Sequence, residues 1–347
     1  MKQRELGRTG ISVSELCLGT MTFGTQTSEA DSHAQMDMAL AHGVQFWDCA
    51  EMYPVNPLTK ETQGDAERIL GNWFEKTGRR NEVVLATKHS GAGYKNVRDG
   101  APITAATIPE AIEGSLKRLK TDVIDLYQFH WPNRGSYMFR QNWKFDPSKQ
   151  NRAETLANME ACLEALQREV ERGTIRAFGL SNESAWGTCQ WLAAAERVGG
   201  PRVASVQNEY SLLCRLYDTD MAEMSVNEDV GLLAFSPLAA GFLTGKYQAG
   251  AVPEASRMSL VPEMGGRMTP RVLDAVAAYL AIAARHGLDP VHMALAWTLT
   301  RPFMGSSIFG ATTVGQLEHA LGAGDVVLSA EVLKEIDAAH KLHPMPY

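Results

Sequence analysis

Eight short apolar runs, separated by longer segments of helical periodicity, constrain the fold of this 347-residue chain more than any other feature of its sequence. Between the runs, apolar residues recur at i, i+3 and i+4, which is typical of amphipathic helices. Strands that alternate with helices are expected to be parallel and joined by crossovers, and eight such units close naturally into a barrel. The runs are Leu16–Gly19, Gln45–Ala50, Val83–His89, Asp125–Trp131, Ile175–Asn182, Val203–Tyr210, Gly231–Leu238 and Ser306–Ala311.

We therefore predict an α/β protein with one (β/α)₈ TIM-barrel domain spanning residues 1–347. A short N-terminal β-hairpin is expected before the barrel, with its turn at Arg8-Thr9-Gly10. The clearest helical patterns cover Ala34–His42, Ile108–Leu119, Leu156–Arg172, Ala185–Val198 and Pro270–Arg285.

A doubly wound dinucleotide-binding sheet is the alternative fold, and it has a specific test. Its first strand should lead into a helix through the motif GxGxxG. Here the first run leads into Gly19-Thr20-Met21-Thr22-Phe23-Gly24, which lacks that motif, and Gly91-Ala92-Gly93 is only a GxG fragment in a loop. The barrel is therefore favoured.

Charge and hydropathy exclude several classes of partner. The net charge is −7, from 33 Lys and Arg against 40 Asp and Glu, and no basic run could track a phosphate backbone. The first twenty residues lack the apolar core of a secretory signal, and no apolar stretch is long enough to span a bilayer. We expect a cytoplasmic protein that binds neither nucleic acid nor membrane.

The cysteines are scattered, with no CxxC and no Cys/His pair at metal-binding spacing. We expect them to be small buried apolar residues in a reduced compartment, and we expect no metal. Cys49 adjoins the candidate site, but no base is evident that would make its thiol reactive, so packing is its expected role. The five are Cys17, Cys49, Cys162, Cys189 and Cys214.

Two long segments interrupt the alternation of strand and helix. Residues 54–64 extend the loop after the second run, and residues 132–151 extend the loop after the fourth. Such βα loops stand at the C-terminal mouth of a barrel, where active sites lie, so both are expected to face the substrate. Surface decoration is the alternative.

Ionisable residues end three of the predicted strands: Asp48, Lys88 and His130. Taken singly, each has an ordinary structural explanation as a cap or a loop residue. Parallel strands of a barrel end at one mouth, however, and Tyr53 follows Asp48 by five positions. Together the four residues predict a catalytic constellation.

The chemistry centres on Tyr53, whose phenol is ordinarily a weak acid with a pKa of about 10. A nearby Lys88 ammonium should lower that pKa, and Asp48 should keep the lysine charged and aimed. His130 can orient a carbonyl oxygen beside the hydroxyl, and it could also pass a proton. These groups would stabilise an alkoxide as hydride reaches the carbonyl carbon, which implies a nicotinamide cofactor because no side chain donates hydride.

Polar groups after the later strands are candidates for holding that cofactor. Ser181, Asn182 and Gln207 could hydrogen-bond a carboxamide. Phe235-Ser236-Pro237-Leu238 offers an aromatic face and polar groups, and Gly310-Ala311-Thr312-Thr313 opens a helix that runs through Gln316 and could bind phosphate. Ordinary turn and cap chemistry is the alternative at each position.

With these residues the chain resembles the aldo-keto reductases, and within them the Tas-like branch related to potassium-channel β subunits. The resemblance covers nearly the whole chain. It rests on Leu18-Gly19-Thr20-Met21, Asp48-Cys49-Ala50-Glu51-Met52-Tyr53, Ala86-Thr87-Lys88, Asp125-Leu126-Tyr127-Gln128-Phe129-His130-Trp131, Gly179-Leu180-Ser181-Asn182, Gln207-Asn208-Glu209-Tyr210 and Gly310-Ala311-Thr312-Thr313.

The resemblance implies NADPH-dependent reduction of aldehydes or ketones, with a catalytic tetrad of Asp48, Tyr53, Lys88 and His130. It places the carboxamide on Ser181, Asn182 and Gln207, and the nicotinamide against Phe235. Ser236, Leu238 and Lys246 would line the pyrophosphate, while Arg257, Thr312 and Gln316 would lie near the adenosine ribose and its 2′-phosphate. Lys246 and Arg257 suit NADPH better than NADH, because the extra phosphate is anionic.

Two departures from the family pattern limit these assignments. His319-Ala320 stands where many relatives have Glu-Asn near the adenine, which leaves the adenine contacts and some tolerance of NADH open. The long segment 54–64 leaves the substrate open, because it adjoins Tyr53. The oligomeric state has no signature in the sequence.

Two other functions are weighed against a reductase. A protein that senses NADP(H) and regulates a partner would keep the same barrel and tetrad, although no extra N-terminal segment or exposed partner helix is evident. A metal-dependent lyase or isomerase would need ligands at several strand ends, where only Asp48 and His130 qualify and Lys88 would repel a cation.

Overall fold

The computed structural model describes all residues 1–347 and contains the predicted closed barrel. Its strands are all parallel and follow the order β10-β3-β4-β5-β6-β7-β8-β9 around the barrel. They are β3 (Leu16–Gly19), β4 (Phe46–Asp48), β5 (Val84–His89), β6 (Ile124–Phe129), β7 (Ile175–Ser181), β8 (Val203–Glu209), β9 (Gly231–Phe235) and β10 (Met304–Phe309). Each predicted run overlaps one of these strands, although β6 and β10 begin one and two residues before their runs. The fold class is confirmed, and the doubly wound alternative is wrong.

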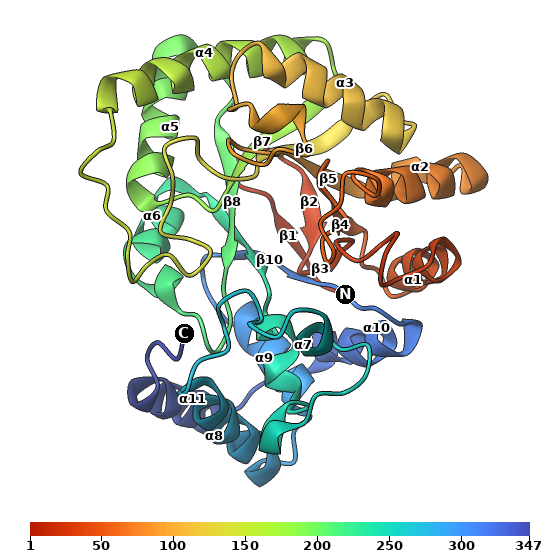
Figure 1. Ribbon diagram of the computed structural model, residues 1–347, viewed down its shortest axis with the longest axis vertical. Coiled ribbons are helices and arrows are strands. Elements are labelled where there is room, and N and C mark those ends of the chain that lie inside the picture. The colour runs from red at the N-terminus through yellow and green to blue at the C-terminus, as the bar shows by residue number, and fades with distance from the viewer.

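Helices surround this barrel, as Figure 1 shows. Glu29–Ala41 forms α1, and nine other long helices follow along the chain. They are α2 (Asp65–Thr77), α3 (Thr107–Leu119), α4 (Arg152–Glu171), α5 (Ala185–Val198), α6 (Asp220–Glu228), α8 (Val272–Arg285), α9 (Pro290–Leu299), α10 (Val314–Leu321) and α11 (Ala330–Leu342). Shorter helical turns are η1 (Arg80–Glu82), η2 (Arg98–Gly100), η3 (Leu216–Asp218), η4 (Ala239–Thr244), η5 (Gln248–Gly250), α7 (Arg257–Leu260) and η6 (Gly322–Asp325).

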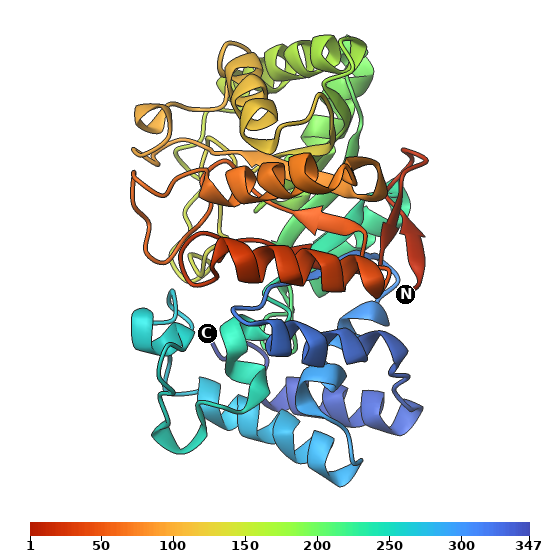
Figure 2. The ribbon, with the colours of Figure 1, turned by 90° about the vertical axis from the view of Figure 1, so that its right-hand side faces the viewer.

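The predicted N-terminal hairpin closes one end of the barrel. Strands β1 (Gln3–Glu5) and β2 (Ser12–Ser14) pair antiparallel. Leu6, Ile11 and Val13 of this hairpin pack with the side chains inside the barrel, where they form the floor of its interior. In Figure 2 the hairpin lies at one end of the barrel and the long loops lie at the other. The loops therefore stand at the open, C-terminal mouth.

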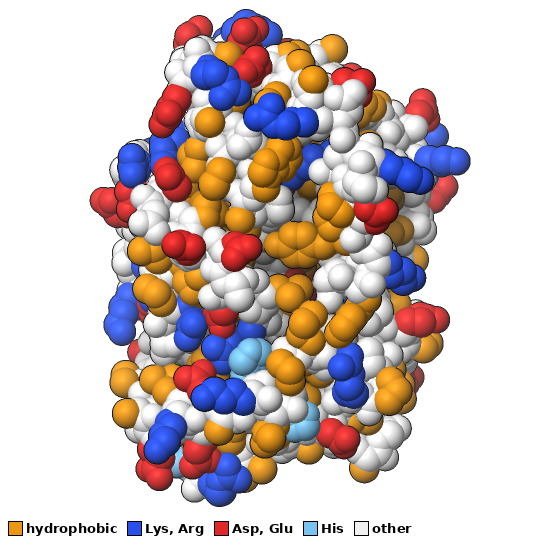
Figure 3. Space-filling view, turned by 90° about the vertical axis from the view of Figure 1, so that its left-hand side faces the viewer, with side chains coloured by type: hydrophobic (Ala, Val, Ile, Leu, Met, Phe, Trp, Pro, Cys, Tyr) orange, Lys and Arg blue, Asp and Glu red, His pale blue; other side chains and the backbone are white.

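The structure can be compared with two further expectations from the sequence, one about membrane-spanning segments and one about burial of the cysteines. Lys and Arg are interspersed with Asp and Glu over the face in Figure 3, and hydrophobic side chains lie around its central hollow. None of the helices combines the length and the apolar character needed to cross a bilayer. Cys17, Cys49 and Cys162 are buried as expected, but the expectation is wrong for Cys189, which is exposed, and for Cys214, which is partly exposed.

Candidate active site

Asp48, Lys88 and Tyr53 lie together at the C-terminal mouth of the barrel. Asp48 pairs with Ala86 across β4 and β5, which places the end of β4 two residues before Lys88. The Lys88 ammonium lies 2.6 Å from Asp48 Oδ2 and 3.4 Å from the Tyr53 hydroxyl. All three side chains are almost fully buried. The structure therefore brings Asp48, Lys88 and Tyr53 into direct contact.

Lys88 has a partner for each of its three N–H groups. Besides Asp48 and Tyr53, it donates to the Cys49 carbonyl at 2.7 Å. Burial by itself favours the neutral amine, but the Asp48 carboxylate and the other acidic groups raise the pKa of Lys88 above its usual value. Lys88 is therefore a fixed ammonium ion beside the Tyr53 hydroxyl.

The second oxygen of Asp48 is held by two amides that the sequence did not assign to this role. Gln128 Nε2 donates to Asp48 Oδ1 at 3.1 Å, and Gln207 Nε2 donates to it at 2.8 Å. Gln128 was missed, although it alternates with His130 along β6 and so lies on the same face of the strand. These two bonds fix the carboxylate that in turn holds Lys88.

Lys88 acts on the pKa of Tyr53 in the expected direction, but the net shift of that pKa is upward. Burial raises the pKa of Tyr53 to about 12, and the Lys88 ammonium only partly opposes that rise. A phenol buried to this extent loses more from desolvation of its anion than one nearby cation returns. Tyr53 is therefore fully protonated near neutral pH, as a proton donor must be.

His130 lies beside Tyr53, with the two ring centroids 5.8 Å apart. Burial, assisted by the nearby Lys88 charge, lowers the pKa of His130 well below its usual value, so the imidazole is neutral. Its Nδ1 atom is buried and has no hydrogen-bond partner. A neutral ring can still donate one hydrogen bond, which suits the placing of a carbonyl oxygen better than the passing of a proton.

The three residues predicted to hold a carboxamide lie against this tetrad. Asn182 Nδ2 donates to the His130 carbonyl at 2.9 Å and to Ser181 Oγ at 3.1 Å. The Ser181 hydroxyl donates to the Gln207 carbonyl at 2.8 Å. Asn182 Oδ1 is buried without a partner, so a hydrogen-bond acceptor is free at this point of the mouth.

The chain that follows β9 has backbone suited to close approach by a ligand. Phe235 and Leu238 are partly buried there, and Ser236 has a positive φ of 54°. Within η4, Gly241 has a φ of 94°, and a Cβ at this position would lie 3.3 Å from Lys246 Nζ. The structure thus brings Lys246 over the turn that follows Ser236 and Leu238.

Two arginines lie farther along the same segment. Arg257 begins α7 and forms no ion pair, and burial together with the like charge of Arg267 lowers its pKa to about 10. Arg267 was missed by the sequence analysis. It contacts Ser236 Oγ at 3.4 Å, but nothing in the local sequence distinguishes it from a solvated arginine. An anion would relieve the repulsion between these two cations.

The residues predicted to bind phosphate after the last strand, Gly310 to Thr313 and Gln316, lie at the start of α10. Thr313 caps the helix, and its hydroxyl accepts from Gln316 N at 3.2 Å. Gln316 Oε1 in turn accepts from the backbone and the hydroxyl of Thr312. Gly310 lies against Gly19, whose carbonyl would be 3.0 Å from an added Cβ. No hydrogen bond joins this group to Lys246 or Arg257.

The loop at residues 54–64 starts and ends at Tyr53. The Tyr53 carbonyl accepts from Gly64 N at 2.9 Å, and Val55 N donates to the Met21 carbonyl at 3.2 Å. The loop is therefore closed at its base, and the backbone of Tyr53 forms part of that closure.

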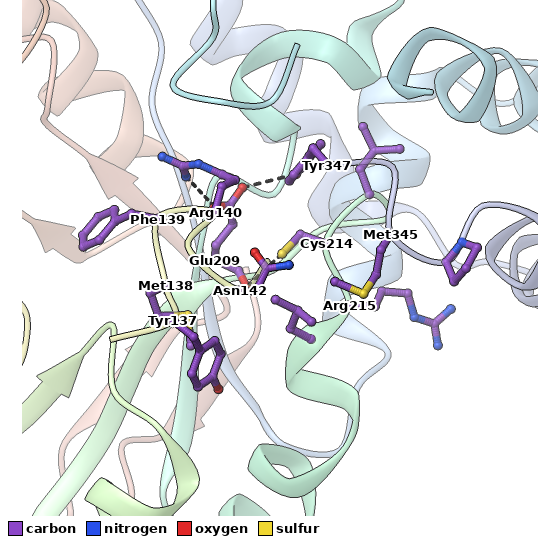
Figure 4. Close-up of a pocket in the computed structure, with 13 residues that line it drawn as sticks. Tyr137, Met138, Phe139, Arg140, Asn142, Glu209, Cys214, Arg215, Met345 and Tyr347 are labelled. Carbon is purple, nitrogen blue, oxygen red and sulfur yellow. Dashed lines mark hydrogen bonds and ion pairs between the residues drawn. The ribbon is translucent and has the colours of Figure 1, made fainter. Parts of the chain in front are cut away.

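The loop at residues 132–151 contributes an aromatic surface and an ion-pair cluster. The Phe139 ring lies 6.4 Å from Trp131, whose own ring lies 5.0 Å from His130. Arg140 contacts Glu209 at 2.8 Å. Figure 4 shows Arg140 and Tyr347 converging on this carboxylate, which also receives Arg267 at 2.8 Å. Glu209 thus joins the loop to the segment that follows β9.

The sequence comparisons identify the family of this barrel protein. A model of the Aldo/keto reductase family matches residues 15–341. The chain belongs to the aldo/keto reductase family and is an oxidoreductase of that family, whose members generally use NAD(P)H.

Three relatives place the chain more narrowly. It is 43% identical to "Protein tas" of Escherichia coli K12, over 100% of this chain and 99% of that protein. It is 32% identical to "Uncharacterized oxidoreductase YrpG" of Bacillus subtilis, over 97% and 95% of the two chains. A "Probable voltage-gated potassium channel subunit beta" of Arabidopsis thaliana is 31% identical over 99% and 98%. The chain therefore belongs to the Tas-like branch of the family.

Proposed function

We propose that this protein reduces small aldehydes or ketones to alcohols with NADPH, using Tyr53 as the general acid. The observation that carries the proposal is the buried contact of Lys88 with both Asp48 and the Tyr53 hydroxyl. A fixed cation at this point stabilises the tyrosinate that remains after the proton has been given away.

The residues present fit a nicotinamide dinucleotide phosphate. The free Asn182 Oδ1 could accept from a carboxamide, and Phe235 lies at the strand end where an aromatic ring could face the nicotinamide. Lys246 and the unpaired Arg257 are cations that favour a phosphate over a bare ribose. When bound, NADPH would supply the hydride.

Side chains of the protein would supply the proton that the substrate oxygen takes up. His130, as a neutral donor, would hold the substrate oxygen beside Tyr53. As negative charge develops on that oxygen, the Tyr53 hydroxyl would donate its proton, because an alkoxide is a stronger base than a tyrosinate. Lys88 would stabilise the tyrosinate, and Asp48 would keep Lys88 in place. Trp131 and Phe139 provide an apolar surface near His130 that favours aromatic or otherwise apolar carbonyl compounds.

Substitution of Tyr53 by Phe tests this mechanism. We expect oxidation of NADPH with 4-nitrobenzaldehyde, followed at 340 nm, to fall by at least about a hundredfold, since the proton donor is gone while the ring that packs beside Lys88 remains. The Kd for NADPH, measured by fluorescence titration, should stay within about threefold of the unchanged protein. Equal turnover in the two proteins would overturn the role of Tyr53.

A matched variant separates loss of the acid from general damage to the barrel. Tyr279→Phe also removes a buried hydroxyl, but in α8, so its turnover should remain near that of the unchanged protein. A cofactor-sensing function would give another result: tight NADPH binding and negligible turnover of the unchanged protein on a broad carbonyl panel. That result would overturn the reductase proposal.

A further inference from the structure

Asp289, His292 and His319 form a cluster on the outer surface of the barrel that takes no part in the proposed hydride and proton transfer, although the resemblance puts His319 near the adenine of the cofactor. One potential ligand atom from each residue lies within 4.8 Å of the others. Asp289 and His292 lie at the start of α9, and His319 lies in α10, so the cluster joins two helices. The side chains of Asp289 and His319 are 34% and 49% exposed, which gives an ion access from solvent.

Asp289 is held as a carboxylate with one oxygen committed. Its side chain caps α9 by accepting from Val291 N at 2.8 Å and His292 N at 3.0 Å, both through Oδ1. Oδ2 lies 2.9 Å from His319 Nε2. One anionic oxygen is therefore fixed at the cluster.

His292 is held in a defined orientation by the backbone of α10. Its Nε2 lies 2.6 Å from the His319 carbonyl, and the ring packs on Gly322, where an added Cβ would come within 2.8 Å of it. A neutral imidazole that donates from Nε2 keeps its lone pair on Nδ1. Metal-binding histidines commonly donate their second N–H to a backbone carbonyl in this way.

We propose that Asp289, His292 and His319 bind a divalent transition-metal ion of the zinc class. Imidazole nitrogen together with one carboxylate suits zinc, nickel or copper, whereas magnesium and calcium take oxygen ligands. The ion would replace the proton between His319 and Asp289, and water would complete the coordination. Sequence analysis predicted no metal here, because His319 lies thirty positions from Asp289 and only the fold brings the two helices together.

Titration with Zn²⁺ and Co²⁺ tests the proposal, on protein without an affinity tag. Cys189→Ser serves as the background, because the exposed thiol could also take the metal. We expect one equivalent of Zn²⁺ by calorimetry, and visible Co²⁺ bands of the intensity typical of four-coordination. His292→Gln and His319→Gln should each weaken Zn²⁺ binding by at least about tenfold.

Two further variants separate loss of a ligand from loss of structure. Asp289→Asn keeps a good helix cap but removes the anionic oxygen, so it should weaken Zn²⁺ binding while the circular dichroism stays unchanged. His286→Gln removes a histidine that also pairs with a carboxylate, Glu335 at 3.0 Å, and it should leave Zn²⁺ binding intact.

The site does not exist if the background protein takes up no stoichiometric Zn²⁺. It is also refuted if the double variant His292→Gln/His319→Gln binds as tightly as its parent. Both results would leave the reductase proposal unaffected, because carbonyl reduction is measured without added metal.

Discussion

Protonation of Tyr53 is governed by burial more than by its charged neighbour, and this has a consequence for the pH dependence. With a pKa of about 12, Tyr53 keeps its proton through the neutral and mildly alkaline range. His130, with its pKa lowered by burial and by Lys88, stays neutral through the mildly acidic range. Neither group should titrate near pH 7.

We therefore expect kcat/KM for carbonyl reduction to be level between about pH 6 and pH 9. The reverse reaction needs tyrosinate as the base, so the rate of alcohol oxidation should rise about tenfold per pH unit across the same range. Steady-state rates in both directions, measured in buffers of constant ionic strength, check this. An inflection of the reduction rate near pH 6.5 would show instead that His130 titrates in this range.

At the residue scale, the sequence was enough to identify the ionisable groups of the site. It was not enough to predict whether burial or the Lys88 charge dominates the pKa of Tyr53. Asp48, Lys88 and His130 end strands, and a barrel brings strand ends together, so their meeting was predictable. The sign of the Tyr53 shift was not, because it depends on how completely the phenol is desolvated. Arg267 was also out of reach, since its contact with Glu209 spans 58 positions of chain.

At the element scale, the helices show where apolar periodicity stops being informative. Helix α4 starts at Arg152, a turn before the predicted Leu156, and α1 starts at Glu29 rather than Ala34. Their first turns are mostly exposed and contain no large apolar residue, so no apolar period marks them. The caps Ser28 and Asn151 were the available signal, since each accepts hydrogen bonds from the backbone of the first turn.

Helices α2 and α3 meet at a glycine, which gives a prediction at this scale. A Cβ at Gly71 would lie 2.2 Å from the Arg118 carbonyl. Gly71→Ala should therefore lower the free energy of unfolding by about 1–3 kcal/mol, even though alanine is the better helix former. Urea denaturation followed by circular dichroism measures the change.

Gly315→Ala in α10 is the matched control, because no atom lies within 4 Å of its added Cβ. It should leave stability unchanged or raise it by a few tenths of a kcal/mol. Equal effects at both glycines would show that the α2–α3 contact has room for a methyl group.

At the scale of the whole molecule, the two ends of the barrel are predicted to have separate roles. Leu6 is fully buried at the floor, and Leu6→Ala should cost about 2–4 kcal/mol of unfolding free energy, because it leaves a cavity there. The catalytic groups stand at the opposite end, so kcat at 25 °C should remain within about twofold of the unchanged protein. Chemical denaturation and steady-state kinetics on the same preparation test both statements.

Leu342→Ala provides the comparison, because Leu342 is 78% exposed in α11 and its truncation should cost less than about 0.5 kcal/mol. A large loss of kcat in Leu6→Ala with stability retained would contradict the separation of floor and mouth. The barrel itself was predictable because its strands are largely buried on both faces and so leave apolar runs in the sequence. The cluster around Glu209 was not, since it joins segments that share no local pattern.

The closure of the loop at residues 54–64 on Tyr53 has a bearing on how this protein could diversify. Since Gly64 N meets the Tyr53 carbonyl, the two ends of the loop are held together whatever lies between them. The entropy of closing a loop grows only slowly with its length, so insertions and deletions inside it are cheap. Selection, or an engineer, could therefore change which substrates reach the site by exchanging this segment while the proton donor stays where it is.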